Sequence, residues 1–289
     1  GIRSPAKDTI LSYATHKVGR GWGFGIHEAI DQIGAVAGPL IFAVSIAVFG
    51  GYSTGFALLA IPFVLLCAAL LLAYRKVPDP ESFEESSPGT RHDETARVPR
   101  LLLPYGTFTA LTMAGFAVFP LIAFHYSAAS VVPEVQIPVF YAIAMAADAL
   151  FALLIGRLYD RAGLGVLLSI PLVNILVALL AFSSVYSLAL AGAVLWGLSM
   201  GGQETVLRAA LADLTAINKR GTAYGIFNTL YGGAWFVGSL VLGWLYEMDM
   251  RILVGYSVLM QVAAIGAFLW LMHTLKPEKR ISNRPQKTG

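Results

Sequence analysis

The sequence predicts an all-helical protein that spans a membrane, and three observations lead to this fold class. Of the 289 residues, 57% are hydrophobic and 13% are charged, and the mean hydropathy is +0.69. Soluble domains carry about 25% charged residues, so this composition is typical of a protein surrounded by lipid. Eight stretches are apolar over about 20 residues, the length of helix that crosses a bilayer core. Finally, Lys and Arg are distributed unevenly over the two faces that these stretches define.

The eight predicted spans cover, in chain order, residues 21–49, 53–74, 101–125, 136–158, 164–184, 187–211, 221–246 and 252–275. The first carries His27 and two carboxylates, whereas the second is free of charge. The third contains Pro104 and Pro120, which are expected to bend it. The other five follow one another through short turns. The long link 75–100 is rich in Pro, Ser and charge, which is typical of a flexible linker, and residues 276–289 form a polar tail.

The basic residues sort onto one face of the predicted bundle. Membrane proteins concentrate Lys and Arg in the loops on their cytoplasmic side. Of the 20 basic residues, Arg251 lies on one face, and the other nineteen lie towards the opposite face, before the first span, in the links or the span ends next to them, or in the tail. A soluble helical bundle has no reason to sort its charge in this way. The pattern predicts that both ends of the chain are cytoplasmic, in a plasma (inner) membrane.

Residues 1–40 match residues 201–240 at a constant offset of 200, without a gap. The identical positions of the first copy are Gly1, Leu11, Thr15, Arg20, Gly21, Gly25, Ile26, Gly38 and Leu40. Both copies run from a helix end through a basic loop into the next helix, entering from the same face. This is typical of two halves related by an axis along the membrane normal; the alternative is chance similarity within the small alphabet of membrane helices.

Two motifs relate the chain to a known family. The turn GRLYDRAG at residues 156–163 has the pattern G-x-L-x-D-R-x-G between two spans on the basic face. It resembles the signature loop of the major facilitator superfamily, whose members have twelve helices in two six-helix halves. The first span carries the second motif, made of Gly25, Gly34, Gly38 and Pro39. It is similar to the antiporter motif of that superfamily's fifth helix, although Phe42 stands where the motif has a further glycine.

The resemblance implies a major facilitator-type bundle in which eight transmembrane helices of an expected twelve are present, the fifth to the twelfth. The chain is then expected to be truncated at its N-terminus, with residues 1–11 as the end of the fourth helix. Residues 1–74 correspond to the remainder of the N-terminal half and 101–275 to the six-helix C-terminal half. The link 75–100 and the tail 276–289 are expected in the cytoplasm.

The resemblance also implies gating roles for the residues of both motifs, which are Gly156, Asp160, Arg161, Gly163, Gly25, Gly34, Gly38 and Pro39. Asp160 is implied to anchor the loop on the positive N-terminal end of the first span, with Arg161 holding the loop. Gly34 and Gly38 are small residues one turn apart, which lets a neighbouring backbone approach closely, and the proline that follows bends the helix. Gating depends on contacts that exist in one conformation and break in the other.

Ionisable side chains inside the predicted spans are the functional signal. They are Glu28 and Asp31 in the first span, Asp148 in the fourth, and Glu204 and Arg208 in the sixth. The two carboxylates of the first span lie on one helix face. In the second copy of the repeat, the positions equivalent to this face include Asn228, Tyr231 and Trp235. The second, fifth and eighth spans, which the resemblance implies to be peripheral, are almost free of charge. Intramembrane charges usually face a bundle interior or a water-filled route, so the charged spans are predicted to border a central cavity.

Asp148 is the strongest candidate for proton coupling or substrate binding, because it lies about 18 Å along its span at 1.5 Å per residue. Asp31, at a similar depth, is the second candidate. For both, the alternative is a structural polar contact between helices. Glu28 lies nearer the basic face and fits a gate or a helix-end charge equally well. Glu204 and Arg208 are four residues apart and are interpreted as a charge pair.

Other chemistries are disfavoured by the spacing of the residues. The segment HEAID begins like the zinc-binding H-E-x-x-H helix, but Asp31 replaces the second histidine. The segment GRGWGFG lacks the lysine and hydroxyl residue of a phosphate-binding loop. The basic residues are not interleaved with aromatics, which argues against nucleic-acid binding. We expect no catalytic residues, no metal and no cofactor.

These features favour a secondary active transporter that moves a small organic solute across the lipid bilayer by alternating access, coupled to protons and working as a monomer. The glycine motif favours export by antiport with protons. Uptake by proton symport is an alternative of the same class. A receptor or scaffold that has kept the fold and lost transport is an alternative of another class. A membrane-embedded enzyme is disfavoured, because no nucleophile–base pair is visible.

Overall fold

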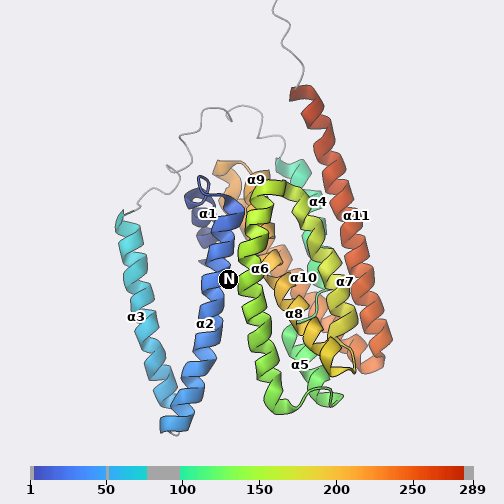
Figure 1. Ribbon diagram of the computed structural model, residues 1–289. Coiled ribbons are helices and arrows are strands. Elements are labelled where there is room, and N and C mark those ends of the chain that lie inside the picture. The colour runs from blue at the N-terminus through green and yellow to red at the C-terminus, as the bar shows by residue number, and fades with distance from the viewer. Residues whose placement is uncertain (1–2, 50–51, 77–97, 283–289) are drawn as a thin grey trace, which may run out of the picture.

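The computed structural model describes residues 3–49, 52–76 and 98–282, which form a bundle of helices (Figure 1). No strand occurs in these ranges. Within them, five helical segments are long and apolar enough to cross a membrane: Ser53–Lys76, Leu102–Ala128, Glu134–Ala181, Ile217–Met248 and Met250–Leu275. The third of these segments covers two of the predicted spans, 136–158 and 164–184. The all-helical membrane class is confirmed.

The chain begins with a short helix, α1 (Arg3–Ala14), followed by two long ones, α2 (Arg20–Phe49) and α3 (Tyr52–Lys76). Both long helices agree closely with the first two predicted spans. α3 stands at the edge of the bundle, close to α2 where α2 ends and α3 begins, and the two helices diverge from there (Figure 1). The large apolar side chains of α3, such as Phe63 and Leu70, are exposed. This exposure is what a helix facing lipid requires.

The third predicted span is broken into two helices, α4 (Val98–Ala114) and α5 (Phe119–Ala128). Pro104 lies inside α4, whereas Pro120 lies in the first turn of α5. A proline in the first turn costs little, because the N–H that it lacks has no partner within the helix at that position. The chain therefore interrupts the helix just before Pro120, where a bend was predicted.

The remaining elements are α6 (Ile137–Ala162), α7 (Ser169–Ala181), α8 (Tyr186–Gly202), α9 (Arg208–Leu214), α10 (Arg220–Met248) and α11 (Met250–Ser282). A π-helical turn, Gln203–Leu207, joins α8 to α9, and short 3₁₀ turns occupy Glu134–Gln136, Gly163–Leu168 and Ile217–Lys219. α6 and α8 pack closely because Gly197 faces the backbone of Ala144. A Cβ atom at Gly197 would lie 1.9 Å from the Ala144 carbonyl oxygen.

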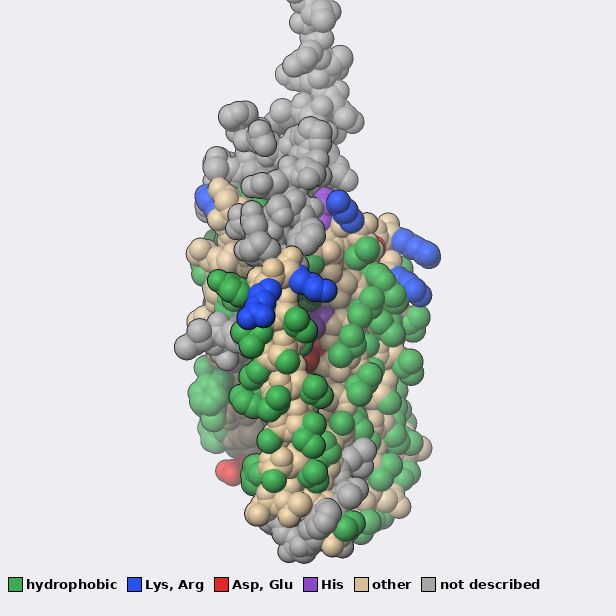
Figure 2. Space-filling view, turned by 90° about the vertical axis from the view of Figure 1, so that its left-hand side faces the viewer, with side chains coloured by type: hydrophobic (Ala, Val, Ile, Leu, Met, Phe, Trp, Pro, Cys, Tyr) green, Lys and Arg blue, Asp and Glu red, His purple; other side chains and the backbone are tan. Residues whose placement is uncertain are grey.

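The internal repeat is visible in the helix bounds. α2 and α10 begin at Arg20 and Arg220, and α1 and α9 end at Ala14 and Leu214, so both pairs of bounds are 200 residues apart. We call the end of the bundle at which α2 and α10 begin the basic end. Lys and Arg side chains gather towards this end of the face shown in Figure 2, and hydrophobic side chains cover most of the rest.

Candidate functional site

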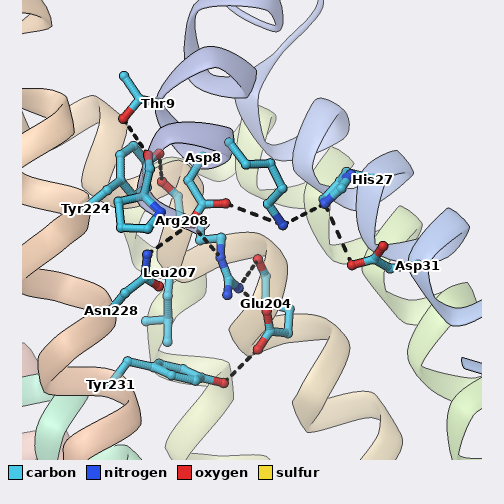
Figure 3. Close-up of polar contacts among 12 residues, drawn as sticks. Asp8, Thr9, His27, Asp31, Glu204, Leu207, Arg208, Tyr224, Asn228 and Tyr231 are labelled. Carbon is cyan, nitrogen blue, oxygen red and sulfur yellow. Dashed lines mark hydrogen bonds and ion pairs between the residues drawn. The ribbon is translucent and has the colours of Figure 1, made fainter. Parts of the chain in front are cut away.

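Arg208 is the centre of a polar cluster near the basic end, where α1, α2, α9 and α10 meet (Figure 3). Its guanidinium forms an ion pair with the Glu204 carboxylate, as the spacing of four residues predicts, and donates from Nη1 to the Glu204 carbonyl oxygen at 2.9 Å. Tyr231 donates from its hydroxyl to Glu204 Oε1 at 3.0 Å. The π-helical turn contains Glu204 and directly precedes Arg208. Such turns often occur at functional sites.

Asp8 joins the N-terminal helix to this cluster. Its side chain is fully buried, and its Oδ2 lies 3.4 Å from Arg208 Nε and accepts a hydrogen bond from Asn228 Nδ2 at 3.2 Å. Asp8 and Arg208 are repeat partners, 200 residues apart, so this ion pair connects equivalent positions of the two copies. Asp8 is not among the residues that the sequence patterns identify. The signal that could have found it is the opposite charge at equivalent positions of the repeat.

Asp31 lies at the far side of the cluster rather than with Asp148. Lys7 Nζ is 3.6 Å from Asp8 Oδ1 and 2.8 Å from His27 Nε2. His27 Nε2 in turn lies 3.8 Å from Asp31 Oδ2, and the Asp31 side chain is 63% exposed. The structure therefore does not bring Asp31 into the bundle interior, although its sequence depth resembles that of Asp148.

Glu28 and Asp148 meet through the side chain of Gln32. Gln32 Nε2 donates to Glu28 Oε1 at 2.7 Å and to Asp148 Oδ2 at 3.0 Å. Glu28 is 7% exposed and Asp148 is fully buried. Asp148 also packs against α8, because Gly201 leaves no side chain between them. The spacing of four residues places Gln32 on the helix face of Glu28, but its contact with Asp148 on another helix could not be read from that spacing.

The repeat partners of this face, on α10, lie together as predicted from their spacing. Asn228 contacts Asp8, Tyr231 contacts Glu204, and Trp235 packs edge-on against Tyr231 with ring centroids 6.0 Å apart. The Trp235 indole N–H is buried and has no hydrogen-bond partner among the described residues. The ring of Phe116 comes next, with its centroid 6.2 Å from that of Trp235. The face thus changes from polar near the basic end to aromatic further along the bundle.

The loop motif holds the beginning of α2. Asp160 Oδ1 accepts a hydrogen bond from the backbone N–H of Gly21, and Asp160 Oδ2 accepts one from that of Trp22, both at 2.8 Å. This is the contact that the resemblance implies, and the carboxylate lies at the positive end of the α2 dipole. Gly163, at φ +67°, ends α6 in a conformation that favours glycine. Arg161 is exposed in the last turn of α6, where a cation complements the helix dipole.

The close backbone approach predicted for Gly34 and Gly38 is made instead by glycines nearer the basic end. A Cβ atom at Gly21 would lie 2.3 Å from the Gly156 carbonyl oxygen, and one at Gly25 would lie 2.5 Å from that of Ala152. No atom lies within 4 Å of a Cβ built at Gly34 or Gly38 in the described structure. The reason is that α2 leans away from α6 as it leaves the basic end (Figure 1). α2 runs as one helix through position 39, whose side chain lies outside the described part.

Replacing Gly21 by alanine is expected to lower the free energy of unfolding by about 1–3 kcal/mol, because the added methyl group overpacks the α2–α6 contact. Its repeat partner provides a matched control. A Cβ at Gly221 would meet only Thr9 Oγ1, at 4.0 Å, so Gly221→Ala should be neutral or stabilise the helix by up to about 1 kcal/mol. Thermal unfolding of both variants in detergent measures the difference. Equal unfolding temperatures for the two variants would contradict the packing argument.

Two further contacts at the basic end are related by the repeat. Arg20 forms an ion pair with Asp213, which also accepts a hydrogen bond from the Tyr159 hydroxyl at 2.7 Å. The Arg220 guanidinium lies over the Tyr13 ring, 5.5 Å from its centroid. Arg20 and Arg220 are repeat partners, and so are Tyr13 and Asp213. In each copy, the arginine therefore contacts the equivalent position of the other copy. Arg20 meets an acid there, Asp213, and Arg220 meets an aromatic ring, Tyr13.

The comparison with known families decides the class of the protein. A family model described as Major Facilitator Superfamily matches residues 1–175 and 109–289. The chain belongs to the major facilitator superfamily. This superfamily consists of membrane transporters, and its match covers both copies of the repeat and the loop motif at 156–163.

Curated relatives of this superfamily member occur in mycobacteria. An uncharacterized protein of Mycobacterium bovis and uncharacterized proteins of two Mycobacterium tuberculosis strains are each 40% identical to it over 268 residues. Each match covers 91% of this chain and 66% of the relative. The chain therefore spans somewhat less than two thirds of the length of the curated relatives that it matches.

The carboxyl groups of this site contact amide, hydroxyl and guanidinium groups of neighbouring side chains. Among the described residues, no group of three or more His, Cys, Asp or Glu side chains is placed to hold a metal ion. The carboxyl groups are instead engaged by an amide, a tyrosine and an arginine. Such contacts between helices can break when the helices separate, which is what a conformational switch requires.

Proposed function

We propose that the full-length protein is a secondary active transporter that exports a small organic solute in exchange for protons, by alternating access. The solute and the protons cross at different times through one site, which opens first to one side of the membrane and then to the other. The protein acts as a monomer. Its basic end faces the cytoplasm of a plasma (inner) membrane, in agreement with the sorting of Lys and Arg.

The buried carboxyls of Glu28 and Asp148 are the observation that carries this proposal. They come from α2 and α6, on opposite sides of the link 75–100, and meet at one amide. Neither forms an ion pair with a Lys, Arg or His among the described residues. A buried acid without a counter-ion is costly when ionised. Binding a proton removes this cost, and it is the chemistry that such an acid offers.

The contacts at the basic end support alternating access. The ion pair of Asp8 with Arg208, that of Arg20 with Asp213, and the cap of Asp160 on α2 all join α1 and α2 to the later part of the chain. In the proposed cycle these contacts hold the basic end closed. Opening the basic end requires these contacts to break together. Their charged groups then become hydrated, which offsets part of the free energy lost with the ion pairs and the helix cap.

Proton movement in liposomes tests the proposed function. The full-length protein is reconstituted into liposomes that contain the pH-sensitive dye pyranine, and a panel of small organic solutes is added outside at equal pH. We expect one or more solutes to enter while protons leave, so the lumen becomes more alkaline. Protons that enter together with the solute indicate symport and contradict the proposed direction. Solute binding without any flux indicates a receptor and overturns the proposal.

A further inference from the structure

Gln32 is the residue through which the two buried carboxyls are connected. Both N–H bonds of its amide are used, one towards Glu28 Oε1 and one towards Asp148 Oδ2. Because both carboxylate oxygens contact one nitrogen atom, they lie less than about 6 Å apart. Two ionised carboxylates at this distance repel each other, so holding one proton between them is favoured.

The surrounding charges do not neutralise this pair. The charged or titratable groups within electrostatic range of Glu28 are Glu204, Arg208, Asp31 and Tyr231, and Glu204 is also within range of Asp148. Arg208 is the cation of this set, and it is engaged by Glu204 and Asp8. The other such groups on the described parts of α1, α2, α3, α6, α8 and α9 are Lys7, Tyr13, Arg20, His27, Cys67, Tyr74, Arg75, Lys76, Tyr141, Arg157, Tyr159, Asp160, Arg161, Tyr186 and Asp213.

Two oxygen atoms of this group lack a partner. Gln32 Oε1 and Asp148 Oδ1 are buried and accept no hydrogen bond within the described structure. A buried acceptor without a donor is unfavourable. A carboxyl group that binds a proton becomes a donor, so a proton on the group offers a hydrogen bond to an acceptor that lacks one.

From this geometry we propose that Glu28 and Asp148 carry one proton between them, and that Gln32 is the positioning residue that keeps the two acids as one unit. This inference rests on the proposed proton coupling and specifies how it is built. The proton comes from water and returns to water, and no other bond is formed or broken. Because Gln32 lies on α2 and Asp148 on α6, separation of these helices divides the unit and releases its proton.

A titration that uses the proton itself as the probe tests the unit without a solute. Protonated carboxyls have an infrared C=O band that disappears on ionisation, and this band is followed in the purified full-length protein as the pH is changed. We expect Glu28→Gln and Asp148→Asn each to change the pH at which this one-proton band disappears, and the double variant to lose the band, so that the effects of the two substitutions do not add. This non-additivity is the mark of residues that act as one unit.

Gln32→Met removes the amide and keeps the size of the side chain. We expect it to change the proton affinity of the pair by about tenfold or more, since a hydrogen bond to a charged group is lost on each side. It should also make the effects of Glu28→Gln and Asp148→Asn additive. Gln136→Met, in the 3₁₀ turn Glu134–Gln136 at the opposite end of the bundle, is the matched control and should titrate like the wild type.

The outcomes separate this inference from the proposed function. Separate bands for Glu28 and Asp148 that add up in the double variant overturn the shared proton, and so does a wild-type titration of Gln32→Met. Neither result affects the flux experiment, which decides whether protons are transported at all. If Asp148→Asn does not yield folded protein, Glu28→Gln decides alone, because a wild-type titration of that variant also overturns the unit.

Discussion

Arg208→Met is expected to reduce the free energy of unfolding by about 3–5 kcal/mol, the usual cost of removing one member of a buried ion pair. The substitution keeps most of the apolar volume and removes the charge. It leaves Glu204 without its cation and Asp8, which is fully buried, without its nearest guanidinium. We expect little monodisperse protein after extraction in detergent, and a much lower unfolding temperature for what is recovered.

Two comparisons show whether the charge balance causes this loss. Arg157→Met is the control, because the Arg157 guanidinium lies over Trp22 at the surface and a cation–π contact there contributes about 1 kcal/mol or less. Adding Asp8→Asn and Glu204→Gln to Arg208→Met removes the unpaired charges, and should restore most of the lost stability. An unfolding temperature of Arg208→Met equal to that of the wild type would contradict a structural role for the ion pair.

The helices could be predicted from the sequence because their signal is local. Long apolar runs are bounded by charged or polar residues, and each predicted span corresponds to helix in the structure. Details that depend on packing could not be read in the same way. The π-helical turn at Gln203–Leu207 is an example, because its residues follow directly on an apolar helix and carry no local signal of a wider turn. Similarly, α11 continues to Ser282, beyond the last apolar residue of its span.

The charged residues of the site were predictable, but most of their partners were not. Glu28, Asp148, Glu204 and Arg208 stand out because charge is rare inside apolar spans. Gln32 is an uncharged residue, and its importance follows from its position between two acids on different helices. Amides are common at helix contacts in membranes, so such a residue cannot be distinguished by type alone.

A second group of neutral residues illustrates the same limit. Gln203 donates to Ser199, Ser199 contacts Asn174, and Asn174 donates to Gln261, which donates to the carbonyl oxygen of Thr112. All are buried. Asn174 and Gln261 lie on α7 and α11, which correspond to spans implied to face lipid. Those helices expose apolar side chains on one side and use single amides on the other, where hydrogen bonds between helices add stability.

Asp148→Asn is expected to abolish proton-driven transport while exchange of solute for solute continues. Asparagine has nearly the same shape as aspartate and keeps an oxygen that can accept the hydrogen bond from Gln32 Nε2. It cannot bind or release a proton between pH values at which proteins are stable. The variant should therefore still open alternately to both sides with solute bound, but a pH gradient should no longer drive accumulation.

Liposomes containing the full-length variant separate the two activities. Exchange is measured with solute on both sides at equal pH, and coupling is measured as accumulation against a solute gradient under an imposed pH difference. Glu247→Gln, an exposed carboxylate near the end of α10, is the control and should retain both. If Asp148→Asn loses exchange as well as coupling, the residue serves the structure or the solute rather than the proton. If it retains pH-driven accumulation, the proton is carried elsewhere, because an amide at position 148 leaves no titratable group there.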